Sequence, residues 1–242
     1  MNSLKIKSEY YIKLIKTNPY PGRGIIMGMT PDSKMLAQVY WIMGRSNNSR
    51  NRIFREEEGF VRTEAWEPSK VEDPSLIIYF PVKHHNRVHI VSNGDQTDTI
   101  YEAVKCSETF EAALSARTFE PDAPNYTPRI SGLMDLEDKK YSYKLSIIKS
   151  IDNNPDFCQR QFFYYEEGIP GYGHCLHTYS TDGDPIPSFD REPFLVPIFS
   201  DIQETADFYW NTLNYDNKIS LLVKYINIET NDFRTVIINK NK

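Results

Sequence analysis

The 242-residue chain has a net charge of −5, ordinary shares of apolar and charged residues, and three cysteines. This acidic balance disfavours nucleic acid or an anionic membrane as the main partner, although a local basic pocket stays compatible with it. No stretch approaches the roughly 18 apolar residues of a membrane span. Cys106, Cys158 and Cys175 are odd in number and widely spaced, which favours reduced thiols over a disulfide framework. We therefore expect a cytoplasmic protein that does not bind membranes.

The first 19 residues mix lysines with apolar residues but contain no unbroken hydrophobic stretch and no small-residue cleavage site. Such a segment is typical of a short helix or an extended arm, not of a signal peptide. We see no linker, repeat or low-complexity tract after it. We expect one domain over residues 1–242, with residues 1–19 as an amino-terminal arm.

Two strands are predicted first, over Gly24–Met29 and Met35–Met43, joined by the turn-forming Thr30-Pro31-Asp32-Ser33. Side chains alternate along a strand, and both faces of Met35–Met43 carry apolar residues. A strand that is apolar on both faces is usually covered on both faces. We therefore expect these strands to belong to an inner layer.

Further segments have the composition of strands. They are Ile53–Trp66, Leu76–Val82, Arg87–Val91, Tyr141–Ile151, Arg160–Tyr165, Cys175–Tyr179, Lys218–Ile228 and Phe233–Asn239. Helices are predicted over Thr99–Phe119, capped by Thr97 or Asp98, and over Asp201–Leu213. Many strands with few helices, not strictly alternating, indicate an α+β fold of packed layers.

Several common active-site patterns are missing from the sequence. There is no strand–GxGxxG–helix fingerprint, no GxxxxGK[ST], no HExxH and no GxSxG. His174 and His177 lie three apart in a predicted strand, so they should point to opposite faces and not share a metal ion. The same objection applies to the adjacent His84 and His85. We predict no metal site.

Two polar loops are candidates for ligand binding. Ser92–Asp98 contains the turn pair Asn93-Gly94 and leads into a helix, so Asp95 could accept hydrogen bonds from a ribose or simply cap that helix. Glu120–Gly132 is a proline-stiffened loop that carries Asn125, Thr127 and Arg129. A loop of this kind suits binding, but it equally suits any long connection.

The segment Gly44–Arg52, GRSNNSRNR, concentrates cations and amides directly after a strand. Arg45, Arg50 and Arg52 together with Ser46 could clamp a phosphate, because guanidinium groups match phosphate oxygens two at a time. Asn51 and the neighbouring asparagines add amide groups suited to a sugar or a base edge. The alternative is a solvated turn whose arginines pair with the acidic residues at positions 56–58.

Taken in order, these motifs resemble those of the archaeal-type IMP cyclohydrolase family and its bacterial relatives. The resemblance rests on Tyr20-Pro21-Gly22-Arg23, GRSNNSRNR, VSNGDQTD, EPDAPNYTPRISG and TYSTDGDPIPSFDREP, which cover roughly Tyr20 to Pro193. It implies a four-layer αββα sandwich related to the amino-terminal-nucleophile hydrolases, without self-processing. It also implies a homo-oligomer and suggests a tetramer.

The reaction implied by the resemblance is the dehydrative ring closure of 5-formamidoimidazole-4-carboxamide ribotide to IMP in purine biosynthesis. Both reacting groups sit on one imidazole, so the reaction needs no metal, cofactor or covalent nucleophile. A base near the amide nitrogen and a hydrogen-bond donor to the formyl oxygen would assist it. Two alternatives stay open: a non-catalytic purine-nucleotide-binding protein, and an amide hydrolase that uses Cys175 or Ser46.

The resemblance suggests roles for individual residues. Tyr79, Glu120 and Arg45 are the catalytic candidates: Glu120 as base or proton shuttle, Tyr79 as hydrogen-bond donor, and Arg45 also as part of the phosphate clamp. The substrate-binding candidates are Arg23, Ser46, Arg50, Asn51, Arg52, Asn93, Gly94, Asp95, Asn125, Thr127 and Arg129.

Overall fold

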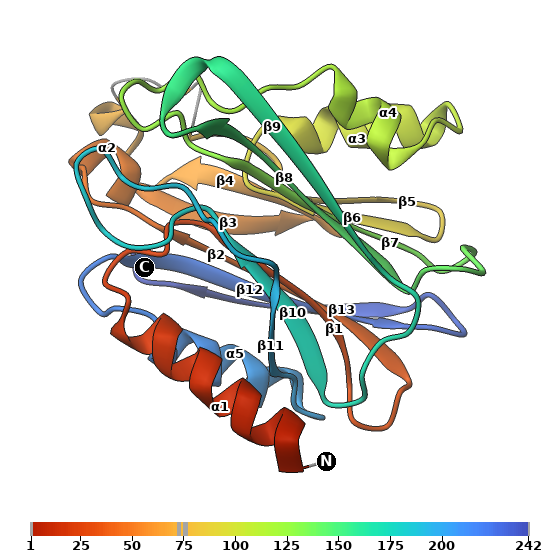
Figure 1. Ribbon diagram of the computed structural model, residues 1–242. Helices are drawn as coiled ribbons and strands as arrows, with labels where there is room; N and C mark the ends of the chain where they lie inside the picture. The colour runs from red at the N-terminus through yellow and green to blue at the C-terminus, as the bar shows by residue number, and fades with distance from the viewer. Residues whose placement is uncertain (1, 72–73, 75–76, 242) are drawn as a thin grey trace.

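Two antiparallel sheets pack face to face at the centre of the computed structural model, which describes residues 2–71, 74 and 77–241 (Figure 1). Sheet A has the order β11-β10-β1-β2-β12-β13 and sheet B the order β3-β4-β5-β6-β7-β8-β9. The strands of sheet A are β1 Gly24–Met29, β2 Met35–Met43, β10 Tyr172–His177, β11 Phe194–Pro197, β12 Lys218–Asn227 and β13 Phe233–Asn239. Those of sheet B are β3 Arg52–Glu57, β4 Phe60–Ala65, β5 Val82–His85, β6 Val88–Ser92, β7 Arg129–Asp135, β8 Tyr143–Ile151 and β9 Asn154–Tyr165.

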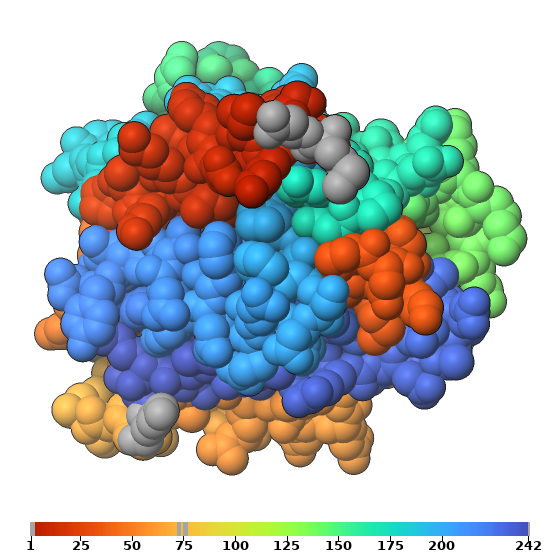
Figure 2. Space-filling view, turned by 90° about the horizontal axis from the view of Figure 1, so that it is seen from below, coloured from red at the N-terminus to blue at the C-terminus, as the bar shows by residue number. Residues whose placement is uncertain are grey.

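Helices cover the outer faces of both sheets. They are α1 Asn2–Thr17, α3 Gln96–Lys105, α4 Phe110–Ser115 and α5 Ile202–Thr212, with a single turn α2 at Asn47–Arg50 and the 3-10 turn η1 at Pro68–Lys70. In Figure 1, α1 and α5 lie on the outer side of sheet A, and α3 and α4 lie on the outer side of sheet B. Figure 2 shows α1 beside the α5 segment on that outer face of sheet A. The α+β class with two antiparallel sheets is thus confirmed.

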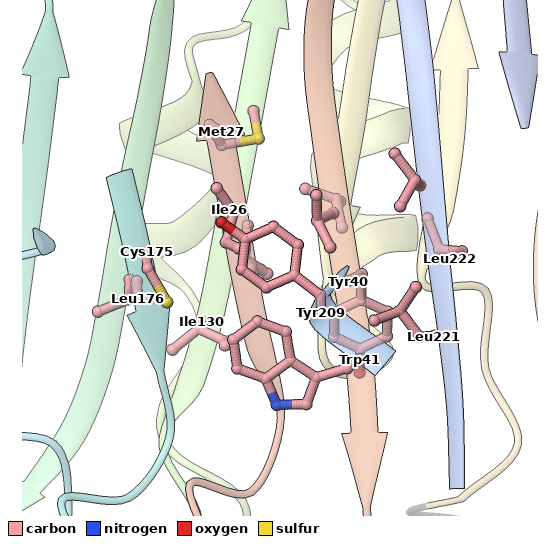
Figure 3. Close-up of a cluster of buried hydrophobic side chains, with 14 of the residues drawn as sticks. Ile26, Met27, Tyr40, Trp41, Ile130, Cys175, Leu176, Tyr209, Leu221 and Leu222 are labelled. Carbon is pink, nitrogen blue, oxygen red and sulfur yellow. The ribbon is translucent and has the colours of Figure 1, made fainter. Parts of the chain in front are cut away.

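Strand β2 is buried along both faces, as its sequence predicts. Tyr40 points toward sheet B, where its ring stacks on Phe54 with 5.6 Å between the centroids. The next residue, Trp41, points the other way, and Figure 3 shows its indole beside Tyr209 of α5. Because neighbouring side chains alternate, one strand contributes to the space between the sheets and to the layer under the helices. The expectation that β1 and β2 form an inner layer is confirmed.

Most predicted strands match observed ones, and β1, β2 and β13 match at both ends. The predicted strand Ile53–Trp66 is wrong as one element: it is the hairpin β3–β4, which reverses at Glu58 and Gly59, both with positive φ. Leu76–Val82 begins outside the described residues, and a strand starts only at Val82. The sequence analysis missed β11 and also β7, which occupies the carboxyl end of the supposed Glu120–Gly132 loop.

The helix predicted over Thr99–Phe119 is two helices, α3 and α4, and Thr109 caps the second by accepting a hydrogen bond from the backbone N–H of Ala112. The cap of α3 is Asp95, not Thr97 or Asp98. Helix α5 follows its prediction closely, with Asp201 as N-cap. The arm before residue 20 is the helix α1, which packs against β11. Among the described residues, no helix combines the length and apolar character needed to cross a bilayer.

Candidate active site

A cluster of charged and phenolic side chains lies buried where several segments meet at one end of the space between the sheets. Arg23 precedes β1, Tyr40 lies on β2, Arg52 opens β3, Tyr79 precedes β5, and Glu120 follows α4. We call these five residues the inter-sheet site. Buried charges and hydroxyls of this density are costly to a fold, so their gathering indicates a functional site.

Arg23 and Glu120 form the ionic centre of the site. A guanidinium nitrogen of Arg23 lies 3.8 Å from a carboxylate oxygen of Glu120, and their side chains are only 12% and 2% exposed. Burial raises the pKa of Glu120 above its ordinary value, while Arg23 and Arg129 act against that shift. A carboxyl group with a raised pKa holds a proton more readily than a free one, which suits an acid–base role.

Tyr40 and Tyr79 form a hydrogen-bonded pair of phenols, with 2.8 Å between the hydroxyl oxygens. Burial and the neighbouring Tyr79 raise the pKa of Tyr40 well above its ordinary value. The backbone of Tyr79 is fixed from sheet B, because its N–H donates to the Thr63 hydroxyl at 2.8 Å and its carbonyl accepts from the Thr63 N–H at 2.8 Å. Tyr79 is therefore held in place by the Thr63 backbone and side chain, with its hydroxyl bonded to a second phenol.

Arg52 is fully buried and forms no ion pair among the described residues, although its charge acts on Glu120. Its Nε donates to the Ser49 carbonyl at 2.7 Å and one terminal nitrogen donates to the Met43 carbonyl at 3.4 Å. The other terminal nitrogen has no hydrogen-bond partner among the described residues, and no described carboxylate forms an ion pair with Arg52. Burial lowers the pKa of Arg52. A buried guanidinium with a free donor is a ready partner for an anion.

The arginines of the GRSNNSRNR segment diverge instead of forming one clamp. Arg52 turns into the inter-sheet site, whereas Arg45 stays half-exposed, pairs with Asp182 at 2.5 Å and lies over the Tyr20 ring at 5.1 Å. Arg50 turns away and donates to the Gly44 carbonyl and the Asn217 side chain, both at 3.0 Å. None of the three arginines pairs with the acidic residues at 56–58. The ion pairs expected for a solvated turn are therefore not formed either.

Ser46 and Asn51 stabilise the segment itself. Ser46 caps α2 in a reciprocal arrangement with Ser49, in which each side chain accepts from the other residue's backbone N–H at 3.1 Å. The Asn51 side chain donates to the Glu67 carbonyl at 2.8 Å and accepts from the Glu67 N–H at 2.7 Å. These contacts hold the start of β3 in place and thereby aim Arg52 inward.

A second wall of the site comes from the predicted loop Ser92–Asp98. The Asn93 amide is fully used within the fold, since it donates to the Pro128 carbonyl and accepts from Ile130 N–H and Gln96. Arg129 donates to Asp95 at 2.6 Å and to Gln96 at 2.8 Å. A Cβ on Gly94 would lie 2.8 Å from an Arg129 nitrogen and 3.4 Å from a Glu120 oxygen. Gly94 therefore lets this turn approach the ionic centre.

The proline-rich loop contributes a polar edge near Tyr179. Thr127 is hydrogen-bonded to the Tyr179 hydroxyl at 2.5 Å, and its own backbone N–H donates to Asp122 at 2.7 Å. The Tyr179 ring stacks on the Tyr20 ring, with 5.8 Å between the centroids. Because Arg45 lies over the Tyr20 ring, this polar edge extends as far as Arg45. Asn125 instead accepts from the Ile186 N–H at 3.0 Å and ties the loop to residues 182–193.

The tyrosines at 20, 40 and 179 and the polar residue Gln96 were not among the site residues predicted from the sequence. Tyr40 could have been noticed, because it is a phenol in a largely apolar buried strand. Tyr20 and Tyr179 lie far apart in sequence, and only the pairing of β1 with β10 brings them together. No local pattern could have revealed that contact.

The histidines singled out in the sequence lie apart from this cluster. His174 is hydrogen-bonded through Nδ1 to the Tyr143 hydroxyl at 2.7 Å, and His177 through Nδ1 to the Tyr179 carbonyl at 2.9 Å. His84 and His89 pack on Phe233 at the far end of the inter-sheet space. Among the described residues, no group of three potential metal ligands comes together.

Neither nucleophile of the amide-hydrolase alternative is arranged for attack. Cys175 is fully buried, and burial raises the pKa of its thiol well above the ordinary value. A buried neutral thiol is a poor nucleophile. Ser46 is occupied in capping α2. The geometry therefore favours chemistry without a covalent intermediate.

Gly22 sets the approach of Arg23 to the site and gives a test of the local geometry. Its φ is +73°, and an added Cβ would lie 2.2 Å from the Thr178 hydroxyl. We expect Gly22→Ala to lower the free energy of unfolding by more than the ~1–2 kcal/mol that a left-handed alanine costs. Gly171→Ala is the matched control, since its φ is +78° but its nearest neighbour is 3.6 Å away. Urea unfolding of both variants checks this; equal losses would contradict it.

The structure thus defines an α+β protein of two packed antiparallel sheets whose buried basic and phenolic site suits an anionic ligand. The chain belongs to the IMP cyclohydrolase-like protein family, whose sequence profile matches residues 20–232.

A curated relative, named IMP cyclohydrolase, comes from Methanopyrus kandleri and is 31% identical over 121 residues. The matched region covers 49% of this chain and 60% of the relative, so the chain spans about three-fifths of that protein's length.

Proposed function

We propose that this protein is an IMP cyclohydrolase that closes 5-formamidoimidazole-4-carboxamide ribotide to IMP with loss of water. The observation that carries the proposal is the inter-sheet site: a buried arginine with no ion-pair partner among the described residues, a phenol held in place, and a carboxyl group of raised pKa in one place. The family membership and the named relative support the same reaction. An internal condensation of this kind requires no metal or cofactor.

The substrate's 5′-phosphate is its anionic group. Arg52 is a buried cation with no ion-pair partner among the described residues. We place the phosphate at Arg52, with Arg45 at the rim as a second contact. Arg50 is less suited to this role, because its guanidinium contacts Gly44 and Asn217. Charge-assisted hydrogen bonds from a fork of N–H donors are the contacts that phosphate oxygens favour.

The remaining binding candidates divide by their contacts. Gly94, Thr127 and Arg129 border the ionic centre, so we assign them to the ribose or the ring. Asp95 accepts a hydrogen bond from Arg129 and so holds that side chain in place. Its carboxylate oxygens can each accept a further hydrogen bond, and we propose a ribose hydroxyl as the donor. We assign Ser46, Asn51, Asn93 and Asn125 to holding the surrounding loops, since their side chains are bonded within the fold.

In the first step, the carboxamide nitrogen attacks the formyl carbon, and a proton leaves that nitrogen as the formyl oxygen gains one. Tyr79 is placed to donate a hydrogen bond to that oxygen as negative charge develops on it. Glu120 accepts the proton from nitrogen, aided by its raised pKa, and passes it to the formyl oxygen. Arg23, 3.8 Å from Glu120, keeps the carboxylate form accessible and polarises the carboxamide.

In the second step, the hydroxyl on the new ring carbon leaves as water together with the hydrogen of the former formamide nitrogen. This forms the C=N bond of the purine. Glu120, again a carboxylate, takes up this proton from the nitrogen and delivers it to the departing hydroxyl, so the carboxyl returns to its starting state. Tyr79 lies beside the same oxygen throughout and can assist both steps.

We further propose a relationship to the amino-terminal-nucleophile hydrolase fold, without self-processing, on the strength of the layered sheets and helices. In this proposal residues 1–242 act as one domain whose arm, residues 1–19, is the helix α1 packed on β11. We also propose a cytoplasmic homo-oligomer, with a tetramer as the form the family resemblance suggests.

Incubation of the pure protein with the formylated ribotide tests the function. The account predicts an increase in IMP absorbance at a rate far above that in buffer. A rate equal to buffer would contradict the proposal. Tight IMP binding without turnover would instead favour the alternative of a nucleotide-binding protein.

Tyr79→Phe removes the proposed donor while keeping the ring. We expect kcat to fall by ~10²–10³-fold, the usual effect of losing one donor to a developing oxyanion. Tyr215→Phe, at a 73% exposed position, is the matched control and should leave kcat unchanged. Steady-state kinetics of both variants check the prediction, which fails if Tyr79→Phe retains the wild-type kcat.

A further inference from the structure

A second polar cluster lies between the sheets, beginning two residues along β2 from Tyr40 of the inter-sheet site. Gln38 on β2, Lys224 on β12 and Thr235 on β13 are direct cross-strand partners in sheet A. They share the face of Tyr40, two residues from Gln38, so they point toward sheet B. Gln38 and Lys224 are both 0% exposed.

The polar atoms of this row lack hydrogen-bond partners. The Nζ of Lys224, both amide atoms of Gln38 and the hydroxyl of Thr235 are buried without a partner among the described residues. A buried donor without a partner keeps its full desolvation cost, and native folds seldom leave several together. The row therefore has the character of a binding site whose occupant completes it.

Two histidines and a phenylalanine close the cluster from the other side. His84 and His89 pair across β5 and β6, with 5.6 Å between the ring centroids, and both pack on Phe233. His89 donates through Nε2 to Asn231 at 2.8 Å, because the Asn231 amide nitrogen is itself committed to the Asn86 carbonyl. Burial and nearby Lys224 lower the pKa of both histidines, that of His89 to about 3. Both rings are neutral at physiological pH.

Lys224 is thus the group of this cluster that carries a positive charge below about pH 7. Its Nζ lies 3.8 Å from the centre of the Phe233 ring, and a cation–π contact of this kind stabilises a positive charge. The ring can face only one of the three N–H groups of the ammonium. Burial lowers the pKa of Lys224 to about 7. The charge of Glu56 on β3 opposes that shift, although the two side chains do not form an ion pair. Arg87, which also acts on His89, is bonded to the Ile228 and Glu229 carbonyls.

We infer that Lys224, Gln38 and Thr235 bind a small monovalent anion of the halide class between the two sheets. One such ion neutralises the single ammonium and accepts from the Nζ, amide and hydroxyl donors at once. A divalent oxyanion would leave an uncompensated negative charge in the interior, and water alone would leave the ammonium uncompensated. The site is independent of the proposed cyclohydrolase activity.

Thermal unfolding tests the inference with chloride as the probe. At pH 6, replacing gluconate by chloride at constant ionic strength should raise the Tm of the wild-type protein. The increment should shrink as the pH rises above 7, because Lys224 loses its charge and chloride affinity falls about tenfold per pH unit. Lys224→Met should abolish the increment, and Thr235→Val should reduce it.

Lys218→Met is the matched control, since Lys218 lies on the same strand but donates to the Trp210 carbonyl. It should keep the chloride increment. The inference is overturned if the increment is absent from the wild-type protein or equal in Lys224→Met. Should Lys224→Met not fold, crystals of the wild-type protein in bromide at pH 6 decide: an anomalous peak within hydrogen-bonding distance of Nζ supports the site, and its absence there overturns it.

Discussion

Glu120→Gln should lower kcat by ~10²–10⁴-fold, the range over which general acid–base groups act. Glutamine keeps the shape and the neighbours of Glu120 but can neither take up nor release the proton that ring closure moves. The KM for the formylated ribotide should change far less than kcat, because the phosphate and ring contacts remain. Steady-state kinetics with the formylated ribotide measure both constants.

The pH dependence makes this prediction specific to Glu120. Burial raises the pKa of its carboxyl group, so kcat/KM should rise with pH through a value above the ordinary 4.5 as the base form appears. In Glu120→Gln that acidic limb should be missing. Glu108→Gln, an exposed position, is the control and should keep the wild-type profile. A persistent acidic limb in Glu120→Gln would assign the base to another residue.

Arg52→Met should weaken IMP binding by ~10–100-fold, since a hydrogen bond to a charged group is worth about 1.5–3 kcal/mol. The affinity for inosine, which lacks the phosphate, should change little. The free energy of unfolding should also change by less than the loss in IMP binding, because Arg52 carries a buried charge with no ion-pair partner among the described residues. Calorimetric titration of both ligands and urea unfolding provide the measurements.

Arg50→Met is the matched control within the same short segment. Its side chain contacts Gly44 and Asn217 instead of the inter-sheet site, so IMP affinity should stay at the wild-type value. Equal losses in Arg50→Met and Arg52→Met would indicate a surface clamp. Equal losses of IMP and inosine affinity in Arg52→Met would place Arg52 at the ring and not at the phosphate.

Local patterns predicted much of the fold. β2 follows from an apolar run that fits burial on both faces, and α5 from its acidic cap and spaced apolar residues. The errors come from turns inside segments of uniform composition. β3 and β4 are separated only by Glu58-Gly59, and α3 and α4 by a short turn in which Ser107 has a positive φ. β7 was missed because prolines just before it suggested a continuing loop.

The sequence indicated which segments carry the candidate site residues, but not how their side chains are arranged in space. The sequence of Gly44–Arg52 shows three arginines but cannot say that only Arg52 turns inward, since this depends on α2 and on Asn51 binding the Glu67 backbone. Tyr79 and Glu120 were candidates from the sequence, yet the phenol partner Tyr40 lies 39 positions away from Tyr79. Lys224 gave no sequence signal, because its lack of a partner is a property of packing.

A crystal structure of the complex with IMP tests the central claim most directly. The account predicts the purine between Tyr79 and Glu120 and the phosphate within hydrogen-bonding distance of the Arg52 guanidinium. IMP bound only outside the inter-sheet site, for instance in the surface pocket lined by Arg50 and Trp66, would contradict it.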